Sequence, residues 1–321
     1  MPTARTTSIA NFMLTLDGVT CGLLTSSAGG DISADVVEET VAGSPFVKKH
    51  IGRPKYEDFT LQFGFGMASP VYDWITATWA ASFARKNGSI TLLDGTLNAT
   101  SEQQFVDALL TTITIPALDA ASKDAGHLTI TISPELTKTA AGSGKAPAAG
   151  KQQHFLASAF RLELDGLDCT HVTKIDSFTV EVRLVDETRD AGTEPAGVVF
   201  PNLRVTMTDG PAAASWQSWF TDFVIDGNND DAKEKNGALV FLAPDLKAEL
   251  GRVVLHNVGI AALRQVPAGA TETVRRLAAD LYCERMELQV GPPAPPAPEK
   301  VVVPTPTKLP VPPAKIIGVP R

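Results

Sequence analysis

The sequence predicts a mainly β protein made of two tandem β-sandwich or barrel domains, each with one flanking α-helix, followed by an extended proline-rich C-terminal arm. Three observations predict this class. "FMLTLDGVTC" (12–21) and "FRLELDGLDC" (160–169) are nearly the same sequence and alternate apolar side chains with a period of two. Further segments then repeat in the same order. After residue 290 the composition becomes proline-rich.

Each repeat opens with a strand and a tight turn. Because side chains alternate between the two faces of a strand, the period of two at 12–16 and 160–164 predicts strands with one buried face. The Asp-Gly pairs at 17–18 and 165–166 follow directly. Glycine tolerates the positive φ that two-residue hairpin turns need, so we expect a turn at both places.

A strand and then a helix occupy the middle of each repeat. "YEDFTLQFGF" (56–65) matches "FPNLRVTMTD" (200–209), and each leads into a segment of helical character. We predict helices over 70–85 and 211–225. Ser69 precedes a proline and is the expected N-cap of the first helix.

The end of each repeat predicts further strands. "NGSITLLD" (87–94) matches "NGALVFLA" (236–243), and "FVDALLTTITI" is echoed by "RVVLHNVGIAAL". Between these matches, Trp74 and Trp219 keep the two helices in register. Matches in one order indicate a duplicated unit rather than two unrelated β domains, so we expect the two units to superimpose.

Composition divides the chain into four parts. Two folded domains, 1–138 and 155–290, are separated by an Ala/Gly/Pro-rich linker, 139–154. The arm, 291–321, carries eleven prolines and is therefore unsuited to a helix or an interior strand.

Charge and cysteine content exclude several classes of partner. The net charge of −8 and the pI near 5.2 argue against a nucleic-acid-binding surface, which needs clustered Lys and Arg. The chain has neither a signal-peptide pattern at "MPTARTTSIANF" nor a run of about 18 apolar residues, so we expect no membrane partner. Three unpaired cysteines suggest buried structural thiols in a reducing compartment: Cys21, Cys169 and Cys283.

Candidate catalytic and ligand-binding motifs are incomplete. "AAGSGKA" (140–146) resembles a phosphate loop, but Ala146 replaces the Ser or Thr that holds magnesium. "DGNNDDAKEKNG" (226–237) begins like a calcium loop, but Asp231 stands where glycine is required and Gly237 where a bidentate Glu is required. The five histidines lack metal-ligand spacing. We therefore expect no enzyme, no cofactor, and no catalytic, cofactor-binding or metal-binding residues.

Several segments of the first domain resemble the tail tube proteins of contractile phage tails and contractile injection systems. They are "NFMLTLDGVTCGLLTSSAGGDISADVVEE", "VKKHIGRPKYEDFTLQFGFGM", "YDWITATW", "RKNGSITLLDG" and "IPALDAASKDAGHLTITISPE", and they cover nearly all of 8–137. The second domain resembles the same family more weakly, chiefly through "FRLELDGLDC" and "VVLHNVGIAALRQVPAGATETVRRLAADLYCERMEL". A standard tube protein carries one such domain, whereas this chain carries two and a proline-rich tail.

The resemblance implies a β-sandwich-like barrel that assembles into six-domain rings, which stack into a hollow tube. Within a ring, neighbouring domains complete a continuous inner β-surface, so exposed strand edges are consumed by assembly. In the family, the long hairpin within 29–52 reaches toward neighbouring rings. Its charged side chains are our candidates for an inter-ring or subunit interface: Asp35, Glu38, Glu39, Lys48, Lys49 and Arg53.

These expectations lead to a structural hypothesis for function. We interpret the protein as an adaptor ring at the end of the inner tube of a contractile injection system, most naturally joining the tube to the cap. A tube initiator or hub-like component at the baseplate end is the second interpretation, and an ordinary duplicated tube subunit is the third. A lumen-carried effector or enzyme ranks last, because no catalytic motif is complete. We expect assembly in the bacterial cytoplasm as part of a phage tail-like particle.

The expected partners are further copies of the chain, the inner tube protein, and a cap, terminator or sheath protein. Two domains per chain fit sixfold symmetry either as a hexamer of two stacked rings or as a trimer forming one pseudo-sixfold ring. The divergent second hairpin, "VEVRLVDETRDAGTEPAGVVF", favours the hexamer. The arm is expected to dock on the cap or sheath protein by adding a strand to an exposed edge, through Val301, Val302, Val303, Ile316, Ile317 and Val319.

Overall fold

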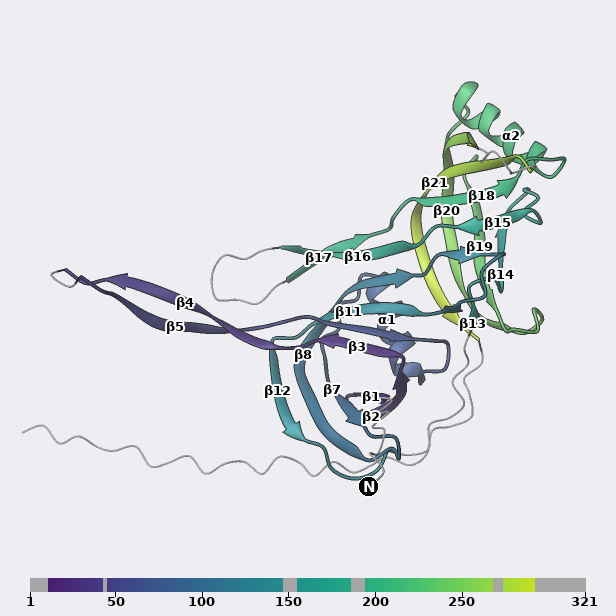
Figure 1. Cartoon of the computed structure of the whole chain (residues 1–321). Coiled ribbons are helices and arrows are strands. Elements are labelled where there is room, and N and C mark those ends of the chain that lie inside the picture. Colours follow the sequence, from purple (N-terminus) through teal and green to yellow (C-terminus); the bar gives the residue numbers. More distant parts are fainter. Residues whose placement is uncertain (1–10, 43–44, 147–154, 186–193, 268–273, 292–321) are drawn as a thin grey trace, which may run out of the picture.

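The computed structural model describes residues 11–42, 45–146, 155–185, 194–267 and 274–291. In this part of the chain the protein is mainly β, with curled sheets and two α-helices (Figure 1). This confirms the predicted fold class for the two domains, whereas the proline-rich arm lies outside the described residues after 291.

A ten-stranded sheet curls around the core of the first domain (Figure 1). Its strands are β1 (Asn11–Leu16), β2 (Val19–Leu24), β3 (Ser26–Gly29), β6 (Phe59–Phe63), β7 (Lys86–Leu93), β8 (Ala99–Ile115), β11 (Leu128–Ser133), β12 (Leu136–Ala141), β16 (Phe178–Val185) and β17 (Glu194–Val199). The main order is β2-β1-β7-β8-β11-β6-β3, with β12 and β16 also paired to β8, and β17 paired to β16.

A seven-stranded sheet forms the second domain, in the order β14-β19-β20-β21-β18-β15-β9. Its strands are β9 (Leu118–Asp119), β14 (Phe160–Leu164), β15 (Val172–Ile175), β18 (Leu203–Thr208), β19 (Lys235–Leu242), β20 (Glu249–Val266) and β21 (Arg276–Val290). Two small sheets complete the described strands: β4 (Ile32–Thr40) with β5 (Val47–Tyr56), and β10 (Ala125–Gly126) with β13 (Phe155–Leu156).

The Asp-Gly turns differ between the two domains. In the first, Asp17 and Gly18 both have positive φ, 47° and 80°, and connect β1 to β2 as a tight hairpin. In the second, Gly166 has a φ of 73°, but 167–171 forms no strand, so β2 has no counterpart. The predicted turn is therefore confirmed in both domains, but a strand follows it directly only in the first.

The helices begin and end at different residues from those predicted. The first, α1 (Ser69–Trp79), has Ala68 as its N-cap, so Ser69 is the first helical residue and not the cap. It ends well before residue 85, because Ala81 takes a positive φ of 57°, which helical residues do not adopt. The second, α2 (Ala213–Phe220), continues as a π-helical turn, Thr221–Ile225.

Matched kinks in the longest strands support the duplication. Asp107 in β8 and Asn257 in β20 are both non-glycine residues with positive φ, 50° and 54°. Their amides donate hydrogen bonds to corresponding side chains, Asn87 Oδ1 at 2.9 Å and Asn236 Oδ1 at 3.3 Å. The kink in β8 separates two halves that pair with different strands, whereas β20 pairs with β21 on both sides of its kink. In β8 the first half pairs with β7 and β12, and the second half pairs with β11 and β16.

The sheets do not follow the order of the chain. The β16–β17 hairpin comes from the second half of the sequence but extends the sheet of the first domain through β8. Conversely, β9 comes from the first half and pairs with β15 in the second sheet. The expected linker, 139–154, contributes its first residues to β12, which ends at Ala141, and 147–154 lies outside the described residues.

Candidate functional site

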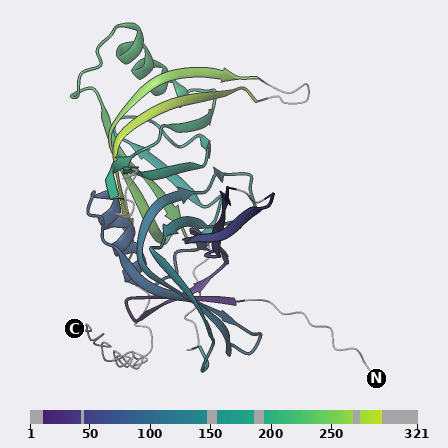
Figure 2. The same cartoon turned by 90° about the vertical axis from the view of Figure 1, so that its left-hand side faces the viewer.

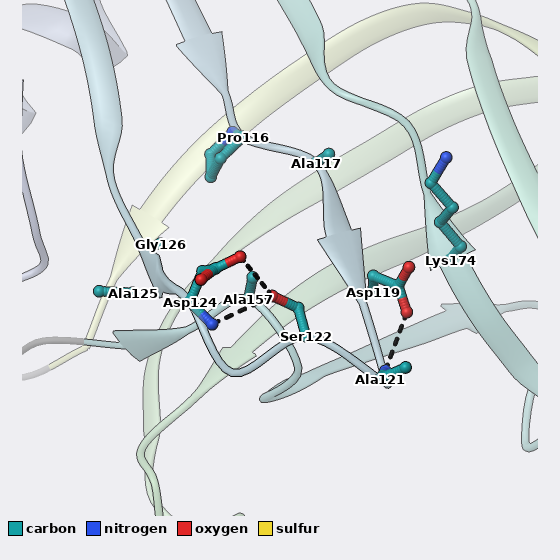
Figure 3. A pocket seen from close by; sticks show the side chains of 10 residues that line it. All are labelled: Pro116, Ala117, Asp119, Ala121, Ser122, Asp124, Ala125, Gly126, Ala157 and Lys174. Atoms are coloured by element: carbon teal, nitrogen blue, oxygen red, sulfur yellow. Dashed lines mark hydrogen bonds between the residues drawn. The ribbon is translucent and has the colours of Figure 1, made fainter.

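The pocket in Figure 3 is a hollow of about 460 Å³ where the loop after β8 meets the second domain. Its polar groups are satisfied within their own turns: Ala121 N donates to Asp119 Oδ1 at 2.8 Å, and Asp124 N donates to Ser122 Oγ at 3.1 Å. The Lys174 ammonium forms an ion pair with Asp176 at 2.7 Å. Ser122 Oγ also donates to Asp124 Oδ2 at 3.1 Å, but both groups are exposed and belong to the same short turn, so we do not assign chemistry to this hollow.

The incomplete motifs also fold as ordinary structure. The start of the phosphate-loop-like segment, 140–146, belongs to β12, and Ala146 is buried. The calcium-loop-like segment, 226–237, turns back on the helix, where Asn228 Nδ2 donates to Asp222 Oδ1 at 2.7 Å. The described residues contain no cluster of three or more potential metal ligands. None of the helices in the described ranges is long and apolar enough to cross a membrane.

The three thiols lie in apolar surroundings. Cys21 and Cys283 are buried, and Cys169 is partly buried. Burial raises the pKa of the Cys21 thiol to about 12, and the pKa values of Cys169 and Cys283 to about 11. Thiols with such pKa values are almost entirely protonated near neutral pH and react slowly.

The charged candidates of the long hairpin lie on β4 and β5, which project away from the rest of the chain (Figure 1). Most of them face one another across the hairpin. Glu38 forms an ion pair with Lys49 at 2.7 Å, and Glu39 lies opposite Lys48 in the register. Asp35 pairs instead with Lys55 at 2.6 Å, and Glu39 also contacts His50 at 3.3 Å. Arg53 lies on β5. These charges therefore stabilise the hairpin itself, although all remain exposed.

Sequence reasoning missed the apolar side chains of the same hairpin. Among them Ile51 is 75% exposed, Val36 57% and Ile32 53%. Soluble domains seldom expose several large apolar side chains on one arm unless a partner covers them. The alternation in "ISADVV" is the signal that could have identified them.

The β8–β16 joint shows how the second domain attaches to the first. Val180 of β16 lies opposite Ile113 of β8, and both side chains are completely buried. One position further along, the hydroxyls of Thr179 and Thr114 are 2.8 Å apart. We use the name internal joint for this pairing of Phe178–Glu181 with Thr112–Ile115.

Helix α1 adds further contacts between the two domains. Its Thr76 hydroxyl donates to the Leu288 carbonyl in β21 at 3.0 Å. The ring of Trp79 packs edge-on against Phe200, with ring centres 6.2 Å apart. Between the domains, Phe65 lies 5.2 Å from Phe155 and 5.0 Å from Phe241 between ring centres. The two domains are thus joined by a shared sheet and a shared apolar core.

The docking-arm candidates, Val301 to Val303, Ile316, Ile317 and Val319, lie outside the described residues.

Solved structures similar to this chain come from several particles. A chain of the extracellular contractile injection system "PVC sheath-tube complex in extended state" is 23% identical, with 40% of this chain and 88% of that chain covered and a TM-score of 0.36. A chain of the "anti-feeding prophage cap (AFP tube terminating cap)" is 24% identical, with coverages of 44% and 91% and a TM-score of 0.36. Hcp1 from Flavobacterium johnsoniae is 17% identical, with coverages of 42% and 99% and a TM-score of 0.24.

Sequence comparison gives a family. No curated protein matches the chain. Residues 9–137 match the family described as T4-like virus tail tube protein gp19. The match takes in every strand from β1 to β11 and helix α1. The first part of the chain, 9–137, thus matches the phage-like tail tube family.

Proposed function

We propose that this protein is a structural adaptor ring at the end of the inner tube of a contractile injection system, and that it joins the tube to the cap. The observation that carries the proposal is a first domain of the tail tube family, fused to a second domain and followed by a proline-rich arm. A tube-type face on one domain can bind the last ring of the tube. The additional parts make the chain unlike a subunit that only repeats.

A structural role fits the surface of the molecule better than catalysis does. The exposed apolar hairpin and the strand edges are features that bind other proteins. The cysteines are held protonated by burial, and the hollow at the domain boundary is lined mostly by small side chains, with polar groups that pair within their own turns.

We propose three chains per ring instead of the six that the divergent second hairpin favours. The internal joint makes the two domains share a sheet, and in a ring with a continuous inner β-surface, domains that share a sheet are neighbours within the ring. The divergent hairpin is the segment that forms this joint. With 34.0 kDa per chain, mass measurement of the purified ring distinguishes 3 × 34.0 = 102 kDa from 6 × 34.0 = 204 kDa.

The position in the particle is tested by electron microscopy of particles from a deletion strain. Loss of the cap with tubes of irregular length is the result expected for a cap adaptor. Tubes that fail to start would move the protein to the baseplate end, as an initiator or hub-like component. Gaps or loss along the whole tube would make it an ordinary duplicated tube subunit. Particles of normal composition and length would refute all three positions.

We also propose that the arm, 291–321, binds the cap or a sheath protein. Extended at about 3 Å per residue, 31 residues can reach on the order of 90 Å, and proline-rich segments lose little entropy on binding. The arm would thereby connect the ring to the component beyond it.

A further inference from the structure

We infer that β4 of one copy of this chain adds to the free edge of β20 in a second copy, so that copies join head to tail. The inference rests on the proposed ring and names the surface that closes it. The internal joint serves as the template. It consists of an edge of β8 and a segment of β16, and duplication gives each of these a counterpart in the other domain, in β20 and in β4. Among the described residues, these two counterparts do not pair with each other within one chain, and their side chains are complementary in part.

The first half is the edge that receives a strand. In β8 the kink at Asp107 is followed by one unpaired extra residue, Thr111, and then by the edge that binds β16. In β20 the kink at Asn257 is likewise followed by one extra residue, Ala261. The edge Thr112–Ile115 of β8 therefore corresponds to residues 262–265 of β20.

The second half is the strand that is added. Within their hairpins, Ser33 of β4 lies opposite Lys55, and Glu181 of β16 lies opposite Val199. Lys55 and Val199 directly precede the matching segments that begin at residues 56 and 200, so they are equivalent. Ser33 therefore corresponds to Glu181. By the same register, Ile32 corresponds to Val180.

Within the described residues, each of these elements lacks the partner that its counterpart has. β16 covers β8, whereas β4 pairs with β5 alone. On the side where β19 ends, no described strand covers β20 beyond Val258. Figure 1 shows the β4–β5 hairpin projecting freely, and Figure 2 shows the ends of β20 and β21 extending beyond the rest of the second domain.

Side chains at the two central corresponding positions are complementary. The buried pair Val180–Ile113 becomes Ile32 facing Leu263, and Ile32 is 53% exposed in the single chain. Burying an apolar pair of this kind favours association.

The neighbouring pair changes its chemistry but stays complementary. The hydrogen-bonded pair Thr179–Thr114 becomes Asp31 facing Arg264, a carboxylate opposite a guanidinium. Arg264 already contacts Asp280 in its own chain, so the added carboxylate would share that guanidinium. Opposite charges across a strand pair fix its register.

The helix side of the internal joint is repeated as well. With the helices aligned on Trp74 and Trp219, the counterparts of Thr76 and Trp79 are Thr221 and Val224. Both are exposed at the end of the α2 region, Val224 by 41%. In the next copy they would meet β12, the counterpart of the β21 segment that α1 contacts, and Tyr56, the counterpart of Phe200.

Two apolar contacts between the domains have no counterpart in the joint between copies. The buried pair Phe178–Ile115 becomes Gly30 facing Gln265. The position equivalent to Phe65, which packs between the domains, is Asp209 in the second domain. The joint between copies therefore lacks this aromatic contact, and we expect it to open before the joint inside the chain opens.

Disulfide cross-linking tests the register. Ser33 and Ala262 correspond to the opposed pair Glu181 and Thr112, and directly opposed residues have a separation that a disulfide can span. The S33C/A262C full-length chain, oxidised mildly with oxidised glutathione, should give covalent dimers and a closed covalent trimer on a non-reducing denaturing gel. The matched control, S33C/A248C, places the second cysteine just before β20, and it should remain uncross-linked.

A charge-reversal pair tests the same contact without new thiols. D31R should weaken self-association about tenfold, because it places two cations opposite each other. D31R combined with R264D should recover most of the loss, which a merely structural role of Asp31 would not allow. Rings of three copies in which S33C/A262C does not cross-link would overturn the strand addition and leave the ring intact. A wild-type chain that stays monomeric at every concentration would overturn both.

Discussion

Replacing Phe65 by Ala should loosen the attachment of the second domain to the first. The Phe65 side chain is 4% exposed and lies between the domains, where its ring centre is 5.2 Å from Phe155 and 5.0 Å from Phe241. A Cβ atom placed on Gly251 would lie 2.8 Å from the Phe65 ring, so the second domain packs closely against this side chain. The substitution removes these contacts without changing either sheet.

The magnitude follows from the burial. Truncating a buried Phe to Ala lowers the free energy of unfolding by about 3–5 kcal/mol. We expect about 3 kcal/mol, the lower end, because the walls of the new cavity come from two domains that can shift toward each other. At about 2 °C per kcal/mol for a large domain, this lowers Tm by roughly 6 °C.

Calorimetry with hydrogen-exchange mass spectrometry measures both effects. Phe63→Ala is the matched control, because Phe63 is completely buried in the first domain, in edge contact with Tyr72 at 6.4 Å. Both variants should lower Tm, but only Phe65→Ala should raise exchange in β13 and β19 of the second domain. Unchanged Tm and exchange in the Phe65 variant would refute a packed interface between the domains.

Three further predictions concern separate parts of the chain. Alkylation of the folded protein at pH 8 should be slow at Cys21, Cys169 and Cys283 and complete after denaturation, because burial raises the pKa values of the three thiols. Rapid, complete labelling of the native protein would show that the thiols are accessible. The backbone amide of Asn98 lowers the pKa of Asp94, in the turn between β7 and β8, to about 2. The Asp94 carboxylate therefore stabilises the fold above its unfolded pKa near 4, and this stabilisation is lost as the pH falls through 2. An NMR titration midpoint near 4 for Asp94 would contradict this. Truncation after Val290 should leave rings that assemble but detach from the next component, and particles of unchanged composition and length would show that the arm does not dock.

Local patterns predicted the elements whose causes are local. The alternation in 12–16 and 160–164 appears as β1 and β14, and the Asp-Gly pair at 17–18 forms the turn that its φ preferences favour. Helix ends were less predictable. Ser69 has the composition of an N-cap, but the chain enters the helix one residue earlier, and the cap makes no side-chain hydrogen bond.

Strand partners could not be predicted, because pairing depends on which edges are free in the folded domain. The alternation of Phe178, Val180 and Val182 shows a strand with one buried face, but it does not show that the face lies in the core of the other domain. For the same reason sequence reasoning chose the charges of the long hairpin as its interface. The charges pair mostly within the hairpin, and Ile32, Val36 and Ile51 are among the large apolar side chains left exposed.

The internal joint also changes how a ring would start. Six separate domains need five bimolecular encounters before the ring can close, and every early intermediate can dissociate at two ends. In this chain every second contact forms within one molecule, at an effective concentration set by the covalent connection rather than by expression level. A ring of three such chains needs only two encounters before it closes, so it can nucleate at concentrations too low for single-domain subunits to nucleate unaided.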